Sequence, residues 1–132
     1  MASAAEQANL AVVRRLCSHW PTLTREEFAQ VMTPDCHYIN LPWPERACTG
    51  PDAAFEFLSF FQTAYVTQLE ILREAANGDV VMSERMETFA RASDGEVLVK
   101  LPVTGVFVMR DGKIAEWRDY FDSAAVVPIM PA

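Results

Sequence analysis

The apolar residues of this chain change their spacing near residue 65, and no other sequence feature constrains the fold as strongly. Before that point they recur every three or four positions, as on one face of a helix. After it they alternate at every second position, which predicts four strands over residues 66–75, 80–91, 97–109 and 114–121. The intervening turns read N-G-D, S-D-G-E and R-D-G-K, and each contains a glycine suited to a tight reversal.

The helical spacing in the first part of the chain predicts two helices in succession. Residues 6–17 carry one apolar stripe, and the H-W-P segment after them ends the helix. Thr24 then caps a short second helix, because T-R-E-E places Glu27 three positions later in a capping box. We expect Pro34 to end this helix.

A short strand, a loop and a third helix complete the expected elements. The strand covers residues 36–41 and lies between prolines, and a proline-rich loop follows it. Pro51 and Asp52 open a strongly apolar helix over residues 53–63. After the last strand, residues 123–130 are expected to form a short closing helix.

Helices followed by a run of long strands indicate an α+β fold in one domain, residues 1–132. Long twisted strands curl around the helices that cover one face, so we expect a cone-shaped, curved, mixed or antiparallel sheet wrapped around the N-terminal helices. This arrangement resembles the cystatin-like α+β barrel of nuclear transport factor 2, ketosteroid isomerase and limonene-epoxide hydrolase. With 51% hydrophobic residues, the chain can bury a core without a metal or a disulfide.

Composition and charge exclude several classes of partner. The net charge of −7 argues against nucleic acid and anionic membranes, which both require a basic surface. We find no apolar run of membrane-spanning length and no signal-peptide pattern. The three cysteines are odd in number and lack a C-x-x-C pair, so we expect free thiols in the reducing cytoplasm and no metal site.

The last predicted strand, in the segment E-W-R-D-Y-F-D, carries a carboxylate among aromatic residues. Alternation places Trp117, Asp119 and Phe121 on one face, which should point inward. A buried carboxylate must be paired, protonated or functional. The structural alternative is an aspartate in an ion pair with a neighbouring strand.

The second long strand holds a similar polar pair. Arg85, Glu87 and Phe89 share one face, and taken alone Arg85 and Glu87 could be a solvated ion pair. The opposite face is apolar enough to be buried against a second subunit, so we expect a homodimer. That face carries Val80, Met82, Met86 and Ala90.

On the short strand, Tyr38 and Asn40 point the same way, and together they could hold one water molecule. Alternatively, Tyr38 is a core tyrosine and Asn40 a residue at a strand end. Taken together, the three strands supply two carboxylates, an arginine, a phenol and an amide. This set suits general acid–base chemistry on a small apolar substrate.

Most of the chain resembles the limonene-1,2-epoxide hydrolase family. The matching segments are Y-I-N-L-P-W-P at 38–44, E-R-M-E at 84–87, G-V-F at 105–107, G-K-I at 112–114 and W-R-D-Y-F-D at 117–122. One departure stands out, since Glu87 occupies a position where the limonene enzyme has aspartate. The resemblance therefore does not specify which epoxide would be the substrate, or with what stereoselectivity.

The resemblance implies a one-step hydrolysis of a small apolar epoxide by water, without metal or organic cofactor. Asp119 would deprotonate a water held by Tyr38 and Asn40, Glu87 would protonate the epoxide oxygen, and Arg85 would bridge the two carboxyl groups. The pocket would have an apolar lining. Its expected members are Phe55, Leu58, Phe61, Phe89, Trp117 and Phe121.

Two other functions are compatible with these residues. The first is an isomerase or a polyketide cyclase, in which Asp119 shuttles a proton and Tyr38 stabilises an oxyanion; such an enzyme has no need of Arg85 between two acids. The second is a non-catalytic ligand-binding module, in which the acids form dispensable salt bridges.

Overall fold

The computed structural model describes residues 1–131, and these contain four α-helices, six strands and three short 3₁₀ turns. The helices are α1 (Ala4–His19), α2 (Arg25–Val31), α3 (Pro51–Ala64) and α4 (Ser123–Val126). The strands are β1 (Met32–Asn40), β2 (Cys48–Thr49), β3 (Tyr65–Asn77), β4 (Val80–Arg91), β5 (Val97–Arg110) and β6 (Lys113–Tyr120). Three 3₁₀ turns cover Trp20–Thr22, Pro44–Arg46 and Val127–Ile129.

The helices start at the signals that their sequences provide. Thr24 and Glu27 form the predicted capping box at α2, and Ser3 with Glu6 forms a second one at α1 that the sequence analysis did not identify. Gly50 precedes α3 with a φ of 88°, and Pro51 occupies its first turn. A side chain at Gly50 would also meet the carbonyl oxygen of Pro34 at 2.8 Å.

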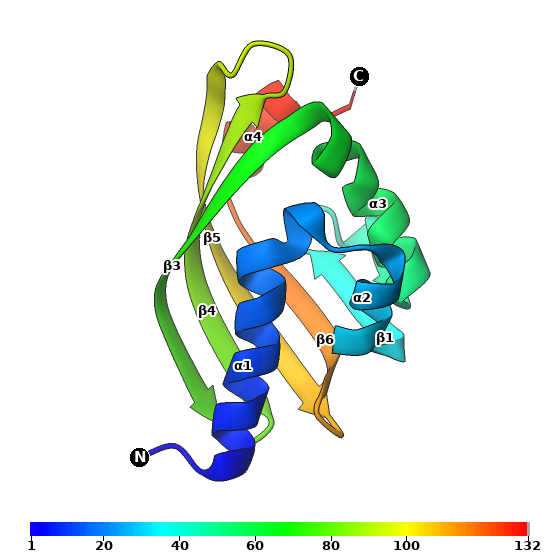
Figure 1. Ribbon diagram of the computed structural model, residues 1–132, viewed down its shortest axis with the longest axis vertical. Helices are drawn as coiled ribbons and strands as arrows, with labels where there is room; N and C mark the ends of the chain where they lie inside the picture. Colours follow the sequence, from blue (N-terminus) through cyan, green and yellow to red (C-terminus); the bar gives the residue numbers. More distant parts are fainter. Residues whose placement is uncertain (132) are drawn as a thin grey trace.

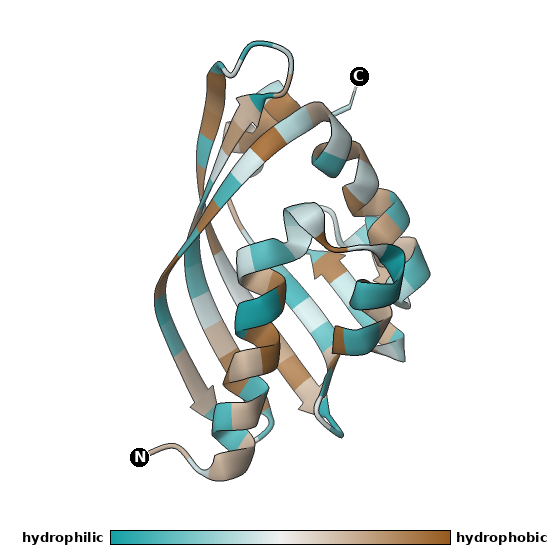
Figure 2. Cartoon of the chain, viewed as in Figure 1, coloured by the Kyte–Doolittle hydropathy of each residue, from teal (hydrophilic) through white to brown (hydrophobic). Residues whose placement is uncertain are grey.

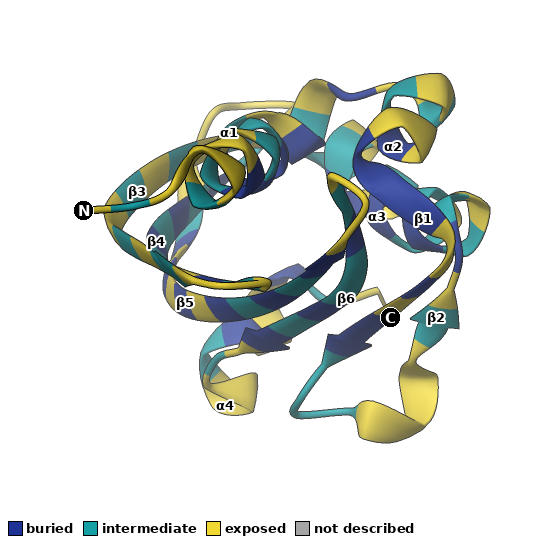
Figure 3. Cartoon of the chain, turned by 90° about the horizontal axis from the view of Figure 1, so that it is seen from below, coloured by how far each residue is buried: buried dark blue, intermediate teal, exposed yellow. Residues whose placement is uncertain are grey.

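The six strands form one mixed sheet in the order β2-β1-β6-β5-β4-β3. All neighbouring pairs are antiparallel except β1 and β6, which run parallel. The sheet curves strongly, and α1 lies across its concave side while α2 and α3 pack at the β1 end (Figures 1 and 3). The predicted α+β order, with N-terminal helices and a curved mixed sheet, is confirmed.

The strand predictions differ from the structure mainly at β1. The four long strands agree to within two residues at each end, but β1 begins at Met32 rather than near residue 36. The helix α2 ends at Val31, so Pro34 lies inside a strand and does not terminate the helix. Proline is tolerated there because the pairing of β1 with β6 is irregular between Met32 and His37. The predicted closing helix is a short α4 followed by a 3₁₀ turn.

The core lies between the concave face of the sheet and the helices. Buried residues alternate with partly buried ones along most of β4, and with exposed or partly buried ones along β5, and Figure 3 shows this banding on the ribbon. Apolar residues on α1 and α3 meet this inner face (Figure 2). No helix within residues 1–131 is long and apolar enough to cross a membrane.

Candidate active site

A cavity opens between α3, the inner face of the sheet and the C-terminal turn, with an empty volume, including its mouth, of about 490 Å³. Its polar groups come from β1, β4 and β6, and most of the remaining wall is apolar. The polar residues are Tyr38, Asn40, Glu87 and Asp119.

Arg85 joins the two acidic residues of this cavity. Its Nη2 donates to Asp119 Oδ2 at 3.0 Å and to Glu87 Oε2 at 3.1 Å, and its Nε donates to the same Glu87 oxygen at 3.2 Å. Arg85 is fully buried, while Glu87 and Asp119 are 6% and 5% exposed. The guanidinium is therefore sealed behind the two carboxyl groups, which border the cavity.

The electrostatics of this group favour a neutral Glu87. Burial raises the pKa of Glu87 above its ordinary value, and the charge of Asp119 adds to this effect, while Arg85 acts against it. Burial also opposes the charge of Arg85, yet the neighbouring carboxylates raise the pKa of its guanidinium. The arginine thus stays charged, and the arrangement suits one ionised and one protonated acid.

Tyr38 and Asn40 lie directly beside Asp119 because of the parallel pairing of β1 with β6. Asn40 faces Asp119 in the strand register, and Tyr38 faces Trp117, on which its ring stacks with centroids 3.9 Å apart. Asn40 Nδ2 donates to the Tyr38 hydroxyl at 3.2 Å. Burial raises the pKa of Tyr38 well above its ordinary value, so the phenol keeps its proton and remains a donor.

The structure places five of the six predicted apolar residues in the cavity wall. They are Leu58, Phe61, Phe89, Trp117 and Phe121. Phe55 is the exception, because it packs against Phe28 at 5.7 Å and lies under the Arg25 guanidinium. On α3 it is about a third of a turn away from Phe61 and so faces α2. The expectation that Phe55 lines the pocket is corrected accordingly.

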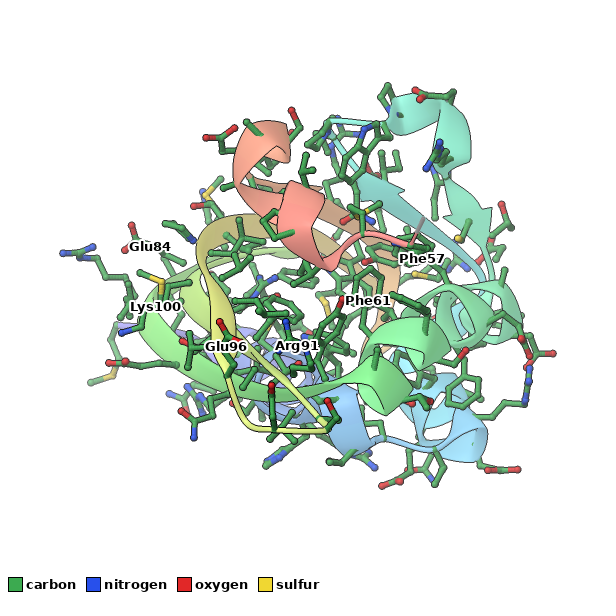
Figure 4. All side chains as sticks on the ribbon, turned by 90° about the horizontal axis from the view of Figure 1, so that it is seen from above. Phe57, Phe61, Glu84, Arg91, Glu96 and Lys100 are labelled. Carbon is green, nitrogen blue, oxygen red and sulfur yellow. The ribbon has the colours of Figure 1, made fainter. Side chains whose placement is uncertain are left out.

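Several wall residues were not identified from the sequence. Phe57 projects from α3 on the same side as Phe61, as Figure 4 shows, and takes the place expected for Phe55. Others come from turns and from the C-terminal segment, where no periodic pattern indicates which way a side chain points. These are Trp20, Trp43, Val126, Ile129 and Met130, together with Leu101 and Val103 of β5.

The C-terminal turn that covers one side of the cavity is fixed to β3. The hydroxyl of Tyr65 donates to the carbonyl oxygen of Ile129 at 2.9 Å. Trp43 and Phe121, from separate loops, meet edge to face with centroids 5.7 Å apart. The wall therefore consists of packed, mutually supported side chains.

Chemically, the site offers a proton acceptor, a proton donor and two groups that can orient a water molecule, all at one end of an apolar pocket. Arg85 and both acids form one hydrogen-bonded group, and Tyr38 and Asn40 border the same cavity. Within residues 1–131, no three His, Cys, Asp or Glu side chains gather so as to hold a metal ion.

Comparison with known proteins identifies a family match over most of the chain. The family model described as the limonene-1,2-epoxide hydrolase catalytic domain matches residues 8–130. The epoxide hydrolase EphG of Mycobacterium tuberculosis is 40% identical over 55 residues, which cover 42% of this chain and 35% of EphG. The match therefore spans about a third of the length of that relative.

Solved structures resemble the whole chain. An LEH-like epoxide hydrolase from Mycobacterium tuberculosis has a TM-score of 0.77 at 24% identity, covering 92% of this chain and 88% of its own. A protein from Jannaschia sp. CCS1, provisionally described as a SnoaL-like polyketide cyclase, has a TM-score of 0.80 at 22% identity, and the match covers 99% of both chains. At these identities the neighbours show the fold alone, and they confirm the predicted nuclear transport factor 2-like architecture.

Proposed function

The chain belongs to the limonene-1,2-epoxide hydrolase family, and from this premise we propose that it adds water to a small apolar epoxide to give a vicinal diol. The observation that carries the proposal is the buried group in which one arginine nitrogen serves both Glu87 and Asp119 at the wall of an apolar cavity. This group suits the simultaneous removal and donation of a proton.

In the proposed reaction, Asp119 is the base. It accepts a proton from a water molecule held by Tyr38 and Asn40, and the water oxygen attacks one epoxide carbon. The position of Asn40 opposite Asp119 in the register supports this role, because it brings the amide and the carboxylate to one point of the wall. Arg85 donates to Oδ2 of Asp119 and so holds this carboxyl group in place beside the water site.

Glu87 is the proposed acid. As the carbon–oxygen bond breaks, its electron pair stays on the epoxide oxygen, and Glu87 protonates that oxygen. Two observations support the role: burial raises the pKa of Glu87, and both Arg85 contacts go to Oε2. The second oxygen, Oε1, is thereby left to carry the proton.

The proton count of this scheme closes without a covalent intermediate. Asp119 gains one proton, Glu87 loses one, and exchange with solvent restores both after the diol leaves. Water and epoxide are the only reactants consumed. We propose that the apolar wall, including Phe61, Phe89 and Trp117, holds the carbon skeleton of the substrate.

We also propose a homodimer formed through the outer face of the sheet, because apolar side chains are exposed on that face. Met82 on β4 is 51% exposed and Val66 on β3 is 60% exposed, although both are apolar. Glu84 and Lys100 project from this outer side, away from Phe57 and Phe61 (Figure 4). An interface here would leave the cavity free on the opposite side.

The function is tested by a panel of small epoxides, with diol formation and product chirality measured by chiral gas chromatography. The proposal expects turnover of at least one cyclic or alkyl epoxide. An isomerase or cyclase would give a rearranged product, and a binding module would take up the ligand without turnover. Either result would refute the proposed hydrolysis.

A further inference from the structure

The contact between Arg85 and Asp119 crosses a whole strand of the sheet. Arg85 lies on β4 and Asp119 on β6, with β5 between them. Neighbouring strands are about 4.8 Å apart, so the arginine side chain must extend over the backbone of β5 to reach its partner. On β5, Gly105 pairs with Asp119, whereas Arg85 pairs with Val103, two positions away, so the arginine crosses β5 obliquely and passes beside Gly105.

Gly105 is the one small residue in the inward-facing row of β5. The rest of that row consists of Val99, Leu101, Val103, Phe107 and Met109. A Cβ atom added at Gly105 would lie 2.7 Å from Arg85 Nη1, 2.8 Å from Asp119 Oδ1 and 2.7 Å from Phe107 Cε1. The space beside this backbone is therefore already filled by the two charged side chains and by a ring edge.

A glycine inside a long strand weakens the strand, since it adds backbone entropy to the unfolded chain and contributes no side chain to the packing. Gly105 also has no positive φ that would call for glycine, unlike Gly50 and the three turn glycines. The physical reason for a glycine here is therefore the close approach of the charged pair and of the Phe107 ring.

We propose that Gly105 is a positioning residue of the acid–base group, because only a bare backbone at this point lets the Arg85 guanidinium pass over β5 and meet Asp119. The inference rests on the proposed function, in which this contact holds the base in place. It assigns a role to a residue that contacts neither the proposed substrate nor the water.

Replacement of Gly105 by alanine tests the inference. The added methyl group pushes Arg85 and Asp119 away from the same point, and an ordinary contact requires each to retreat by roughly half an ångström or more. Since a misplacement of about 1 Å can cost 100-fold in rate, we expect kcat to fall by about 10- to 100-fold. Gly105 does not belong to the cavity lining and the apolar part of the wall keeps its residues, so KM should stay within about threefold.

A matched control separates positioning from general loss of stability. Val81 is fully buried on β4, faces Phe107 in the register and does not line the cavity. Val81→Ile adds a methylene to the same core and is expected to lower the melting temperature while kcat is retained. If Val81→Ile lowered kcat as much as Gly105→Ala at equal loss of stability, the positioning role would be refuted.

The third contact, with Phe107, is tested by a double variant. Phe107→Leu removes the ring edge that the new methyl group would meet. The steric clash with Phe107 is thereby removed, whereas the clashes with Arg85 and Asp119 remain. We expect Gly105→Ala to lower the kcat of the Phe107→Leu variant by the same factor by which it lowers the kcat of the native chain. Recovery of kcat would instead show that Gly105 acts only through core packing.

A readout without substrate keeps this inference distinct from the proposed function. In protein labelled with ¹⁵N-arginine, the side-chain resonances of Arg85 should shift in Gly105→Ala and stay in place in Val81→Ile. Unchanged Arg85 resonances in Gly105→Ala would overturn the inference whether or not the native chain hydrolyses epoxides. Absence of turnover by the native chain, with shifted resonances, would refute the proposed function alone.

If Gly105→Ala is too unstable to purify, Arg85→Lys provides the second variant. Lysine lacks the Nη1 atom that meets the added methyl group. Gly105→Ala should then destabilise the Arg85→Lys chain less than it destabilises the native chain, as measured by the midpoint of urea unfolding. Equal destabilisation in both backgrounds would contradict the proposed contact.

Discussion

Arg85 and Asp119 are 34 positions apart in the sequence, yet Nη2 of the arginine donates to Oδ2 of the aspartate at 3.0 Å. The same nitrogen donates to Glu87, two positions along its own strand. A single buried cation therefore links the two carboxyl groups of the pocket, and the proposed roles of base and acid both depend on it.

Replacement of Asp119 by asparagine should abolish most of the activity. The amide cannot accept the proton from water, and loss of the Asp119 charge also removes one of the causes that raise the pKa of Glu87. General-base catalysis contributes about 10²- to 10⁴-fold, so we expect kcat to fall on the order of 1,000-fold. Circular dichroism should show an unchanged fold.

Tyr38→Phe provides the graded comparison for Asp119→Asn. It removes one hydroxyl that accepts from Asn40, while Asn40 itself stays in place to hold the water. A neutral hydrogen bond contributes about 0.5–1.5 kcal/mol, so the expected loss in kcat is about 2- to 10-fold. Equal losses for the two variants would contradict the division of roles.

Glu87→Gln should remove activity and change the pH dependence of stability in a defined direction. Burial raises the pKa of Glu87 in the folded chain above its ordinary value of 4.5. The contribution of the neutral acid to stability is therefore complete below pH 4.5, and it is lost as pH rises through the folded-state pKa. Glutamine stays neutral at every pH. The free energy of unfolding of the variant, relative to the native chain, should therefore increase as pH rises above 4.5.

Urea unfolding of Glu87→Gln and of the native chain at several pH values measures this difference. In the native enzyme, the same group should cause kcat to fall as pH rises through the raised pKa of Glu87. A stability difference that decreases with rising pH would show that Glu87 is ionised in the folded protein, and would exclude it as the acid.

Glu87→Asp tests whether the pocket is built around the longer acid. Oε2 of Glu87 accepts from both Nε and Nη2 of Arg85, so loss of one methylene draws the carboxyl away from both donors. The displacement exceeds 1 Å, and we expect a fall in kcat of about 100-fold. If kcat rose instead, the native glutamate would not be the optimal acid for the substrate tested.

The proposed dimer predicts that a charge on the outer sheet face yields monomers. Met82→Lys places an ammonium group at an apolar residue that is 51% exposed in the single chain. Desolvating that charge would oppose the interface, and analytical ultracentrifugation should show a monomer. Val127→Lys changes a more exposed apolar residue, 65% exposed, on the C-terminal turn and should leave the dimer intact.

The fold could be predicted from the sequence because its signals are local and agree with one another. Alternation along β4 and β5, glycines in the turns and the capping box at Thr24 all act within a few residues. The start of β1 was not predicted because a proline such as Pro34 normally indicates the end of an element. Pro34 is accommodated inside β1 because the pairing of β1 with β6 is irregular at this point. That pairing is a tertiary feature, which local patterns do not report.

The candidate site was predicted less completely. Strand alternation placed Asp119, Arg85 and Glu87 on the inner face, where the structure brings them together. Helix periodicity could not separate Phe55 from Phe57, because α3 is apolar around most of its circumference. Gly105 lies on β5 between two strands whose register with β5 local patterns do not report, so its contact with the charged pair became apparent only in three dimensions.

The origin of the oxygen in the product tests the central claim most directly. A single turnover in ¹⁸O-labelled water, with enzyme in excess over epoxide, should place one labelled oxygen in the diol in the first turnover, and mass spectrometry should find none in the side chain of Asp119. Label in the Asp119 carboxylate together with an unlabelled diol would show a covalent ester, and a rearranged product with no label in either the product or Asp119 would show isomerisation. Either result would contradict direct attack by water.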